Sequence, residues 1–497
     1  MGLFNRKSKV DAASVASKDS RTVASPQSPL PSKTMNGIAA FPSVSTANIA
    51  LPPAPDPARD PAAYLRSIHA VRERSRLVHE KAKRNNLTHF DVDPTKFGET
   101  AAYIVSIIKR DFAPEYNTIP PHGRWQHFDV GGRHRIDQLL TSWPSKIDAQ
   151  ERTRRLLDLF LVSVLLDAGA GTRWSYRSKE SGKTYRRSEG LAVASLEMFK
   201  AGYFSGDPTQ PYQVNASGLN RLSVGQLAIG LQVSEANPLA GMEGRASLLA
   251  NLGEALQNTE YFGSTFRPGN MLDYLMSHPS TQASSVPVIM IPTLWSVLID
   301  GLAGIWPASR TQVDGVSLGD AWPCSSMPSA PRAQPWENIV PFHKLTQWLC
   351  YSLMGPMTRL LNVQFAGVHL LTGLPEYRNG GLLIDTGLVT LKPADTKRGL
   401  DAYRNNALVK GQPCMEVVPL FSTDDDVVVE WRALTIGFLD DLHVEVNRLL
   451  KLDGPDKLSL AQMLEAGSWK GGRELAEVSR PNTKQPPIMI LSDGTVF

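Results

Sequence analysis

Apolar residues in this chain recur mostly at the three-to-four-residue spacing of an amphipathic helix, and rarely at the two-residue spacing of a strand. In residues 150–167, for example, Leu156, Phe160 and Val164 share one helix face. The same period predicts further helices at 61–86, 94–108, 188–202, 221–232, 242–257, 269–277, 342–353 and 431–451. Only residues 381–392 and 426–430 suggest strands. The chain is therefore predicted to be mainly α with a minor β element, and without βαβ alternation a Rossmann or TIM-barrel fold is disfavoured.

The N-terminal part differs in composition from the rest of the 497 residues. Residues 1–58 are rich in Ser, Ala and Pro and bury too little apolar surface to offset the entropy of ordering, so we predict a disordered tail. Asp60 followed by Pro61 predicts the first helix start. Length alone would allow two or three domains. We expect one mainly helical domain over residues 59–497.

Composition excludes several classes of protein. A hydrophobic share of 42% and a charged share of 20% are ordinary for a globular chain. The net charge of +4 is spread along the sequence, which predicts no nucleic-acid partner. No apolar run is long and clean enough to cross a bilayer, so no membrane association is expected. The spacing of Cys324, Cys350 and Cys414 forms no paired framework, which favours a reducing, cytoplasmic location.

Several partial motifs do not carry chemistry. Residues 169–171 have only the first half of a dinucleotide fingerprint, and residues 182–184 have only the end of a P-loop. The spacing of His122, His127 and His134 matches no zinc pattern. No serine-nucleophile elbow is present. We therefore expect no cofactor and no metal, and serine hydrolases, kinases and nicotinamide dehydrogenases are disfavoured.

The segment LTGLPEYRNGGLLIDTGLVTLK (371–392) is the strongest candidate for a site. Its Pro and paired Gly predict a sharp turn that presents Glu376, Tyr377 and Arg378 at the mouth of a cleft. Asp385 follows in an apolar setting, and two carboxylates in unlike environments can serve as one acid and one base. The alternative is a Glu–Arg ion pair on a surface loop.

Two shorter segments add candidate binding residues. Lys344 and Trp348 lie four apart and share a helix face, so Lys344 either binds an anion or is solvated with its stem on the core. Glu430 and Arg432 would point to the same side if residues 427–432 were extended.

A third segment follows the long apolar helix that ends at Asp167. A Gly-rich turn comes next and then Arg173 and Trp174. Helix ends and adjoining loops often carry sites, and aromatic rings there could stack on a sugar or base. Core packing explains these rings equally well.

Five motifs together resemble a known family. They are RWQHF with its following Gly pair (124–132), FRP (266–268), GDAW (319–322), PFHKLTQWL (341–349) and LTGLPEYRNGGLLIDTG (371–387). The chain is similar over residues 60–497 to the protein-four family of the URC uracil-catabolic pathway, long described as a domain of unknown function. The resemblance implies a role in uracil (pyrimidine) catabolism and possible contact with other enzymes of that pathway.

A remoter similarity links the chain to queuosine-salvage nucleotide glycosylases, which are helical proteins with a likeness to DNA glycosylases. Their Asp-Tyr-Arg motif corresponds to residues 376–378, their Phe-x-Lys helix start to 342–344, and their Glu-x-Arg to 430–432. The apolar helix before Asp167 also agrees. This chain departs by having Glu376 for Asp and by the residues 379–381 that follow. The similarity implies a DNA-glycosylase-like fold.

The two resemblances imply an N-ribosyl hydrolase acting on a ribosylurea-type or nucleotide substrate, possibly 5′-phosphorylated. Glu376 would stabilise positive charge at C1′ and activate water. Asp385 or Asp167 would protonate the leaving group, and the sequence does not rank them. Substrate binding is assigned to Lys344, Tyr377, Arg378, Trp348, Glu430, Arg432, Arg173 and Trp174.

Two alternatives belong to other classes. A non-catalytic protein could bind a pathway intermediate or partner in the same pocket. A metal-dependent amidohydrolase is disfavoured because the chain lacks the His pairs that such enzymes need.

Overall fold

The computed structural model describes residues 46, 48–171, 173–282, 286–328, 334–410 and 416–495, with side chains up to 406 in the fifth range. All of them belong to one unit that spans residues 39–497. Most of the predicted tail at 1–58 lies outside the described residues, as does Cys414. Of the tail residues that are described, Leu51 packs against Gly367, where a Cβ would lie 3.0 Å from it.

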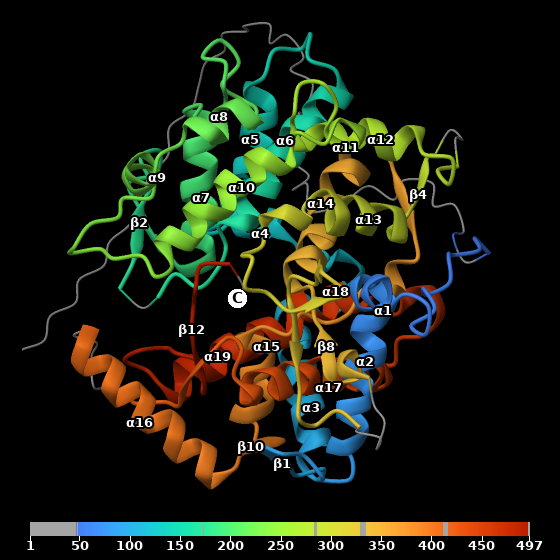
Figure 1. The fold of residues 1–497 in the computed structure, drawn as a ribbon, viewed down its shortest axis with the longest axis vertical. Coiled ribbons are helices and arrows are strands. Elements are labelled where there is room, and N and C mark those ends of the chain that lie inside the picture. Colours follow the sequence, from blue (N-terminus) through green and yellow to red (C-terminus); the bar gives the residue numbers. More distant parts are fainter. Residues whose placement is uncertain are drawn as a thin grey trace, which may run out of the picture. The chain divides into compact units, whose positions relative to one another are not determined.

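The fold is mainly α, as predicted (Figure 1). The teal to yellow-green part holds ten helices among the described residues: α4 (Arg124–Phe128), α5 (Arg135–Ser142), α6 (Ala149–Leu165), α7 (Arg187–Lys200), α8 (Ala216–Arg221), α9 (Val224–Gly230), α10 (Met242–Ala255), α11 (Thr259–Phe262), α12 (Met271–Ser277) and α13 (Ile291–Gly301). Helix α14 (Lys344–Leu361) packs against α6 and α13.

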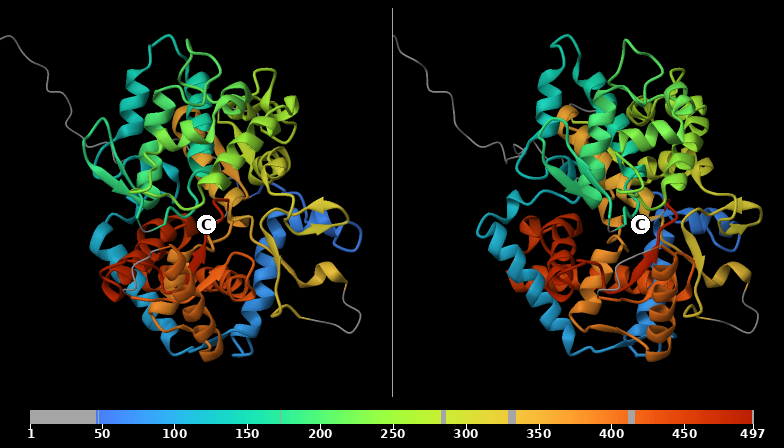
Figure 2. Two further views of the ribbon diagram at one scale, coloured as in Figure 1. Left: turned by 60° about the vertical axis from the view of Figure 1, so that its left-hand side comes forward. Right: turned by 90° about the vertical axis from the view of Figure 1, so that its left-hand side faces the viewer.

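The remaining helices combine the two ends of the described chain. They are α1 (Pro61–Arg66), α2 (Ile68–Ala82), α3 (Lys96–Phe112), α15 (Tyr377–Asp385), α16 (Pro393–Lys410), α17 (Asp426–Leu450), α18 (Leu460–Met463) and α19 (Trp469–Ser479). Figures 1 and 2 show the blue, orange and red helices together below the green ones. The central helix is α17, which packs against α2, α3 and α15.

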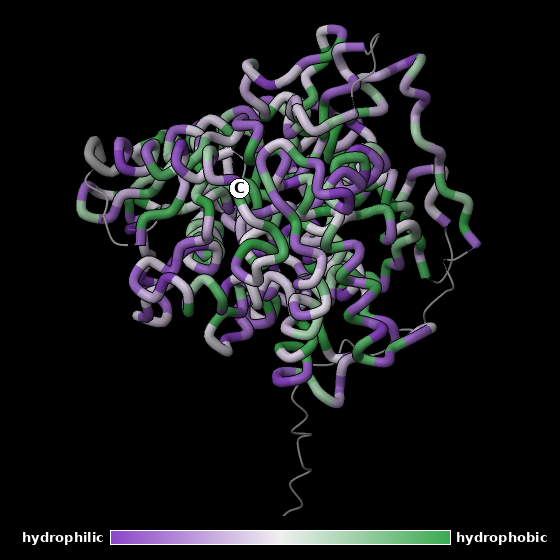
Figure 3. Tube along the Cα trace, turned by 90° about the horizontal axis from the view of Figure 1, so that it is seen from below, coloured by the Kyte–Doolittle hydropathy of each residue, from purple (hydrophilic) through white to green (hydrophobic). Residues whose placement is uncertain are grey.

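Helix starts follow from capping side chains, which satisfy backbone N–H groups that have no partner inside the helix. Asp60 caps α1 and Asp148 caps α6, each accepting a backbone N–H at 2.8 Å. Along the tube in Figure 3, hydrophobic and hydrophilic residues alternate within many coils, as amphipathic helices require. No helix in the described ranges is both long and apolar enough to span a membrane.

The β element is minor, and every described sheet has only two strands. The antiparallel pairs are β1 (Phe90–Val92) with β10 (Val389–Leu391), β2 (Ser175–Arg177) with β3 (Thr184–Arg186), β5 (Gln312–Val313) with β6 (Val316–Ser317), and β7 (Ala321–Pro323) with β8 (Ile339–Pro341). The parallel pairs are β4 (Val288–Met290) with β9 (Gln364–Ala366), and β11 (Leu420–Ser422) with β12 (Met489–Leu491). Most pairs join segments that are distant in sequence.

Both strand predictions need correction. Residues 426–430 are the first turn of α17, where Asp425 accepts the N–H of Val427 at 3.0 Å. The cap by Asp425 and the burial of this helix turn on all sides outweigh the β preference of Val427–Val429. Residues 381–385 belong to α15, and only Val389–Leu391 of the second segment is a strand.

Candidate active site

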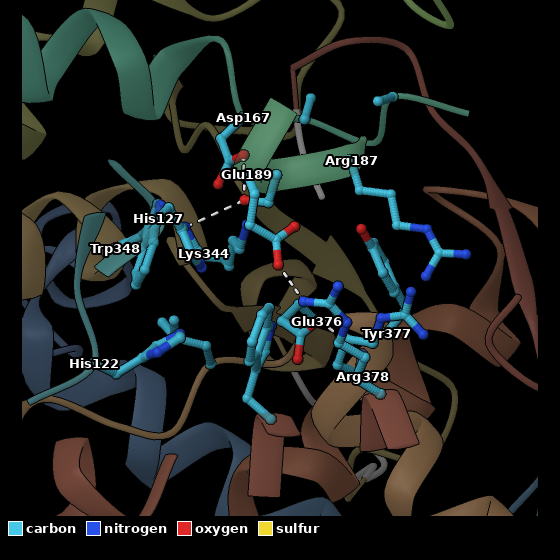
Figure 4. Close-up of a pocket in the computed structure, with 16 residues that line it drawn as sticks. His122, His127, Asp167, Arg187, Glu189, Lys344, Trp348, Glu376, Tyr377 and Arg378 are labelled. Carbon is cyan, nitrogen blue, oxygen red and sulfur yellow. Dashed lines mark hydrogen bonds and ion pairs between the residues drawn. The ribbon is translucent and has the colours of Figure 1, made fainter. Parts of the chain in front are cut away.

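A cavity opens where the two groups of helices meet (Figure 4). Its lining includes three small or aliphatic residues, Ala168, Ala170 and Leu374. The other lining residues are polar or aromatic: His122, His127, Asp167, Arg187, Ser188, Glu189, Lys344, Trp348, Glu376, Tyr377, Arg378, Trp469 and Arg473.

The structure brings six predicted site residues together in this cavity: Asp167, Lys344, Trp348, Glu376, Tyr377 and Arg378. They come from the end of α6, the start of α14 and the start of α15. The expected sharp turn at Gly380 and Gly381 is wrong, because both residues lie inside α15. A Cβ on Gly380 would lie 2.7 Å from the Trp431 ring, so this glycine permits close packing of α15 on α17.

Three predicted residues lie outside the cavity. Asp385 forms a two-pronged pair with Arg480, at 2.9 and 2.5 Å. Trp174 is buried and donates to the carbonyl of Leu231 at 2.9 Å, while Arg173 is exposed. None of the three predicted residues lines the cavity.

Glu430 and Arg432 do not share a face, because they lie two apart on a helix rather than on a strand. Glu430 accepts the backbone N–H groups of residues 88–90 at 2.9–3.1 Å. Arg432 pairs with Asp320 through both nitrogens, at 2.7 and 2.8 Å. Both side chains therefore hold the fold together beneath the cavity wall.

Glu376 is the N-cap of α15, and its carboxylate is fixed by the backbone. Oε2 accepts the N–H of Arg378 at 2.7 Å and Oε1 accepts the N–H of Asn379 at 2.6 Å. Burial raises the pKa of Glu376, while these two bonds and the nearby Lys344 oppose the rise. Each oxygen keeps a lone pair that the cap does not use. A carboxylate of raised proton affinity is thus held in one orientation at the cavity.

Asp167 lies at the end of α6 in a chain of polar contacts. Its Oδ1 lies 2.7 Å from Nη1 of the buried Arg124 and accepts the hydroxyl of Ser188 at 2.5 Å. Ser188 and Arg124 both also lie 3.3 Å from Nδ1 of His127. The guanidinium and hydroxyl donors therefore fix the position of the Asp167 carboxylate.

Lys344 begins α14, and no hydrogen-bond acceptor for its ammonium is found among the described side chains and backbone. Its helix start is set by His343, which adopts a left-handed backbone with φ of 44°. Burial lowers the pKa of Lys344, and the charges of Asp167 and Glu376 oppose that fall. The ammonium is therefore available to a ligand between two carboxylates.

Arginines gather at one end of the cavity, and two of them, Arg187 and Arg378, lie on the right in Figure 4. Arg187 donates to the carbonyls of residues 483 and 484 at 3.2 and 2.9 Å, and Arg378 donates to the latter at 3.4 Å. Arg473 forms an ion pair with Glu189. Burial, followed by the charge of Arg378, lowers the pKa of Arg187 to about 10. Arg187 and Arg378 are held by backbone carbonyls and Arg473 is paired with Glu189, and together they make this end suitable for an anion.

Rings form the opposite end, where His122, His127 and Trp348 lie on the left in Figure 4, and Trp469 packs against both histidines. Centroid distances within this group run from 4.6 Å for His122 and Trp348 to 6.1 Å for the two histidines. No group of three or more His, Cys, Asp or Glu side chains in the described ranges could hold a metal ion.

The sequence reasoning missed six of the charged and aromatic lining residues. His127 belongs to a motif of the family resemblance and His122 lies just before it, so their position was a usable signal. Arg187, Glu189, Trp469 and Arg473 lie on α7 and α19, whose amphipathic pattern does not separate a cavity from solvent. Only the tertiary fold brings them to the site.

Comparison with known proteins agrees with the family suggested by the motifs. A family model described as "Protein of unknown function (DUF1688)" matches residues 64–497. The chain belongs to the DUF1688 family. It is 44% identical to "Uracil catabolism protein 4" of Lachancea kluyveri, over 88% of this chain and 99% of that protein. It is 43% identical to "Protein urg3" of Schizosaccharomyces pombe, over 88% of this chain and 98% of that one. The resemblance to the uracil-catabolism family is thereby confirmed.

Proposed function

We propose that this DUF1688 protein acts in uracil catabolism as an N-ribosyl hydrolase on a 5′-phosphorylated ribosylurea-type compound. The pathway follows from the similarity to a protein named for uracil catabolism. The reaction rests on one observation: a buried carboxylate, Glu376, is fixed by two backbone N–H groups in a cavity that also holds Asp167 and Lys344. The likeness to DNA glycosylases stays a prediction.

The reaction requires a negative charge beside C1′. Breaking the C1′–N bond develops positive charge on the sugar ring, and a carboxylate placed there stabilises it and accepts a proton from the attacking water. Glu376 meets this demand because its raised pKa suits a base and its orientation is fixed. Lys344 has three donors and binds the ribose hydroxyls.

Of the two acids left open by the sequence, neither suits the protonation of the leaving group. Asp385 is paired with Arg480 outside the cavity. Oδ1 of Asp167 is already occupied by Arg124 and Ser188. Asp167 instead adds a second negative charge that balances Lys344 and the sugar cation.

The 5′-phosphate is assigned to the arginine end. Arg187, Arg378 and Arg473 offer planar, two-pronged donors there. Arg432, which the sequence had suggested for substrate binding, is paired with Asp320 instead. Since Arg378 directly follows Tyr377 and Glu376, a phosphate on Arg378 places the ribose beside the proposed base.

The direct test is to incubate the purified chain with ribosylurea 5′-phosphate, ribosylurea and UMP, and to follow free urea, uracil and ribose phosphate. We expect urea release, fastest from the phosphorylated compound. Binding of the compounds without any release would show that the protein binds an intermediate and that the hydrolase proposal is wrong.

Glu376→Gln tests the site. We expect turnover to fall by about 10³-fold, the size of a general-base and electrostatic contribution, and the helix cap to lose about 1 kcal/mol of stability. Urea release and thermal unfolding measure the two effects. Asp148→Asn is the matched control, because it also removes a capping charge, at α6, away from the cavity. Similar turnover in both variants would remove Glu376 from the reaction.

A further inference from the structure

Two N–H groups at the ring end of the cavity have no acceptor. Nε2 of His127 and Nε1 of Trp348 are buried without a hydrogen-bond partner among the described residues, in side chains of residues only 6% and 2% exposed. A buried unpartnered donor costs about 1–3 kcal/mol unless a ligand satisfies it. Both residues line the cavity, so a bound molecule can supply the missing acceptor.

The protonation of His127 follows from its surroundings. Its Nδ1 lies 3.3 Å from both the guanidinium of Arg124, which can only donate, and the hydroxyl of Ser188; we assign Nδ1 as the acceptor from Arg124, which places the hydrogen on Nε2. Burial, followed by the charge of Arg124, lowers the pKa of His127 to about 4. His127 is therefore a neutral donor at physiological pH and not an acid.

His122 has a different arrangement. Its Nδ1 lies 2.5 Å from Oε2 of Glu465, in the turn Leu464–Ser468 that joins α18 to α19. A carboxylate at one ring nitrogen orients the imidazole and leaves the other nitrogen for chemistry. Nε2 of His122 has no hydrogen-bond partner among the described residues, and the ring lines the cavity.

We propose that the ring end is the leaving-group subsite, built for a planar carbonyl-bearing group such as a ureide or a pyrimidine, and that His122 protonates its departing nitrogen. The inference rests on the proposed hydrolase function and supplies the acid that Asp167 and Asp385 cannot be. Two N–H donors call for carbonyl oxygens, and the four rings offer flat walls to a planar group.

The step balances as follows. The C1′–N bond breaks and its electron pair stays on the nitrogen, which takes the proton from Nε2 of His122. The oxygen of water bonds to C1′ and its proton passes to Glu376. One water is consumed, and solvent at the cavity mouth returns a proton to His122 and accepts one from Glu376.

The test compares two leaving groups on one sugar phosphate: ribosylurea 5′-phosphate, whose nitrogen needs a proton, and 4-nitrophenyl riboside 5′-phosphate, whose phenolate leaves without one. In His122→Asn we expect turnover of the urea compound to fall by about 100-fold or more, and that of the nitrophenyl compound to change by less than about threefold. His134→Asn, a side chain 62% exposed, is the matched control.

Equal losses on both compounds, or no loss on either, would overturn the role of His122. Cleavage by the wild-type chain of the nitrophenyl compound alone would overturn the carbonyl-bearing leaving group. Failure of the proposed function gives a different result, because the wild-type chain then cleaves neither compound and Glu376→Gln shows no loss of turnover.

If His122→Asn does not fold, Glu465→Gln carries the test. In this variant the side chain at position 465 can still accept a hydrogen bond from the ring of His122, but it no longer carries a negative charge. We expect about a tenfold loss of turnover on the urea compound only, and equal losses on the two compounds would contradict the proposal.

Discussion

Glu376 and Asp385 lie nine residues apart on the same short helix, yet their surroundings differ in kind. Glu376 at the N-terminus is held by backbone donors and keeps free lone pairs toward the cavity. Asp385 at the C-terminus is bound through both oxygens by Arg480. The first acid can take part in chemistry and the second stabilises the fold. Residue type alone does not distinguish them.

Arg378→Met tests the anion end at the scale of one side chain. Removing a charge-assisted, two-pronged donor should lower kcat/KM for ribosylurea 5′-phosphate by about 10- to 100-fold and leave kcat/KM for ribosylurea nearly unchanged. The ratio of the two kinetic constants is the measurement. Arg110→Met, at an exposed arginine paired with Glu474, is the control. An equal loss of kcat/KM on both compounds would show that Arg378 does not bind the phosphate.

Local sequence was informative for residues whose role depends on neighbours in the chain. Helical spacing predicted that Lys344 and Trp348 share a helix face, and the Glu-Tyr-Arg motif at 376–378 predicted a site; all of these residues line the cavity. Arg187 and Arg473 could not be found this way, because they are ordinary charged residues on amphipathic helices. Their meeting depends on how α7 and α19 pack.

At the scale of elements, the predicted helices agree best where a cap marks the start. Asp60 begins α1 where expected, and α6, which Asp148 caps, begins at Ala149, one residue before the predicted start at 150. The errors occur where burial competes with residue preference: Val427–Val429 look like a strand, but α17 is enclosed by other helices and needs no exposed face. Strands β1 and β10 pair across 301 positions of sequence (Phe90 with Leu391), which local patterns do not reveal.

His89 links three elements, because its ring lies 2.9 Å from Asp395 on α16 and 2.9 Å from Asp426 on α17, next to β1. Burial alone would lower the pKa of His89, but the bonds to Asp426 and Asp395 outweigh it and raise the pKa to about 9. The protonated ring therefore stabilises the folded state fully below about pH 6.5, and this contribution disappears as pH rises through about 9.

His89→Gln should remove that pH dependence. Between about pH 6 and pH 9.5, the free energy of unfolding of the wild-type chain should fall by about 2 kcal/mol more than that of the variant. Chemical denaturation at each pH measures the difference. The exposed His134→Gln should retain the wild-type dependence of unfolding free energy on pH. Equal pH dependence for His89→Gln and wild type would refute the stabilising role of protonated His89.

At the scale of the whole described unit, the C-terminal segment connects the two groups of helices. Pro487 packs on Gly381 of α15, β12 pairs with β11, and Gly494 approaches Gly241 so closely that a Cβ on Gly241 would lie 2.5 Å from its nitrogen. Arg310 pairs with Asp493 at 2.8 Å. The segment also supplies the carbonyls that hold Arg187 and Arg378.

Gly244→Ala should loosen this connection, because a Cβ on Gly244 would overlap the carbonyl oxygen of Asp493. We expect a loss of about 1–3 kcal/mol in stability and faster hydrogen exchange in residues 488–495. Gly98→Ala is the matched control, at the same third position of helix α3 with no atom within 4 Å of the added Cβ, and should gain up to about 1 kcal/mol. Equal behaviour of the two variants would contradict the predicted contact.

The three arginines at the anion end have a consequence for how long the protein survives in the cell. Their mutual repulsion adds to burial in lowering the pKa of Arg187, and a bound anion would relieve that repulsion. By mass action, a ligand that binds only the folded chain lowers the unfolded population in proportion to its concentration. An abundant anionic ligand would then protect the protein from proteolysis, and depletion of that ligand would hasten its degradation without any dedicated regulator.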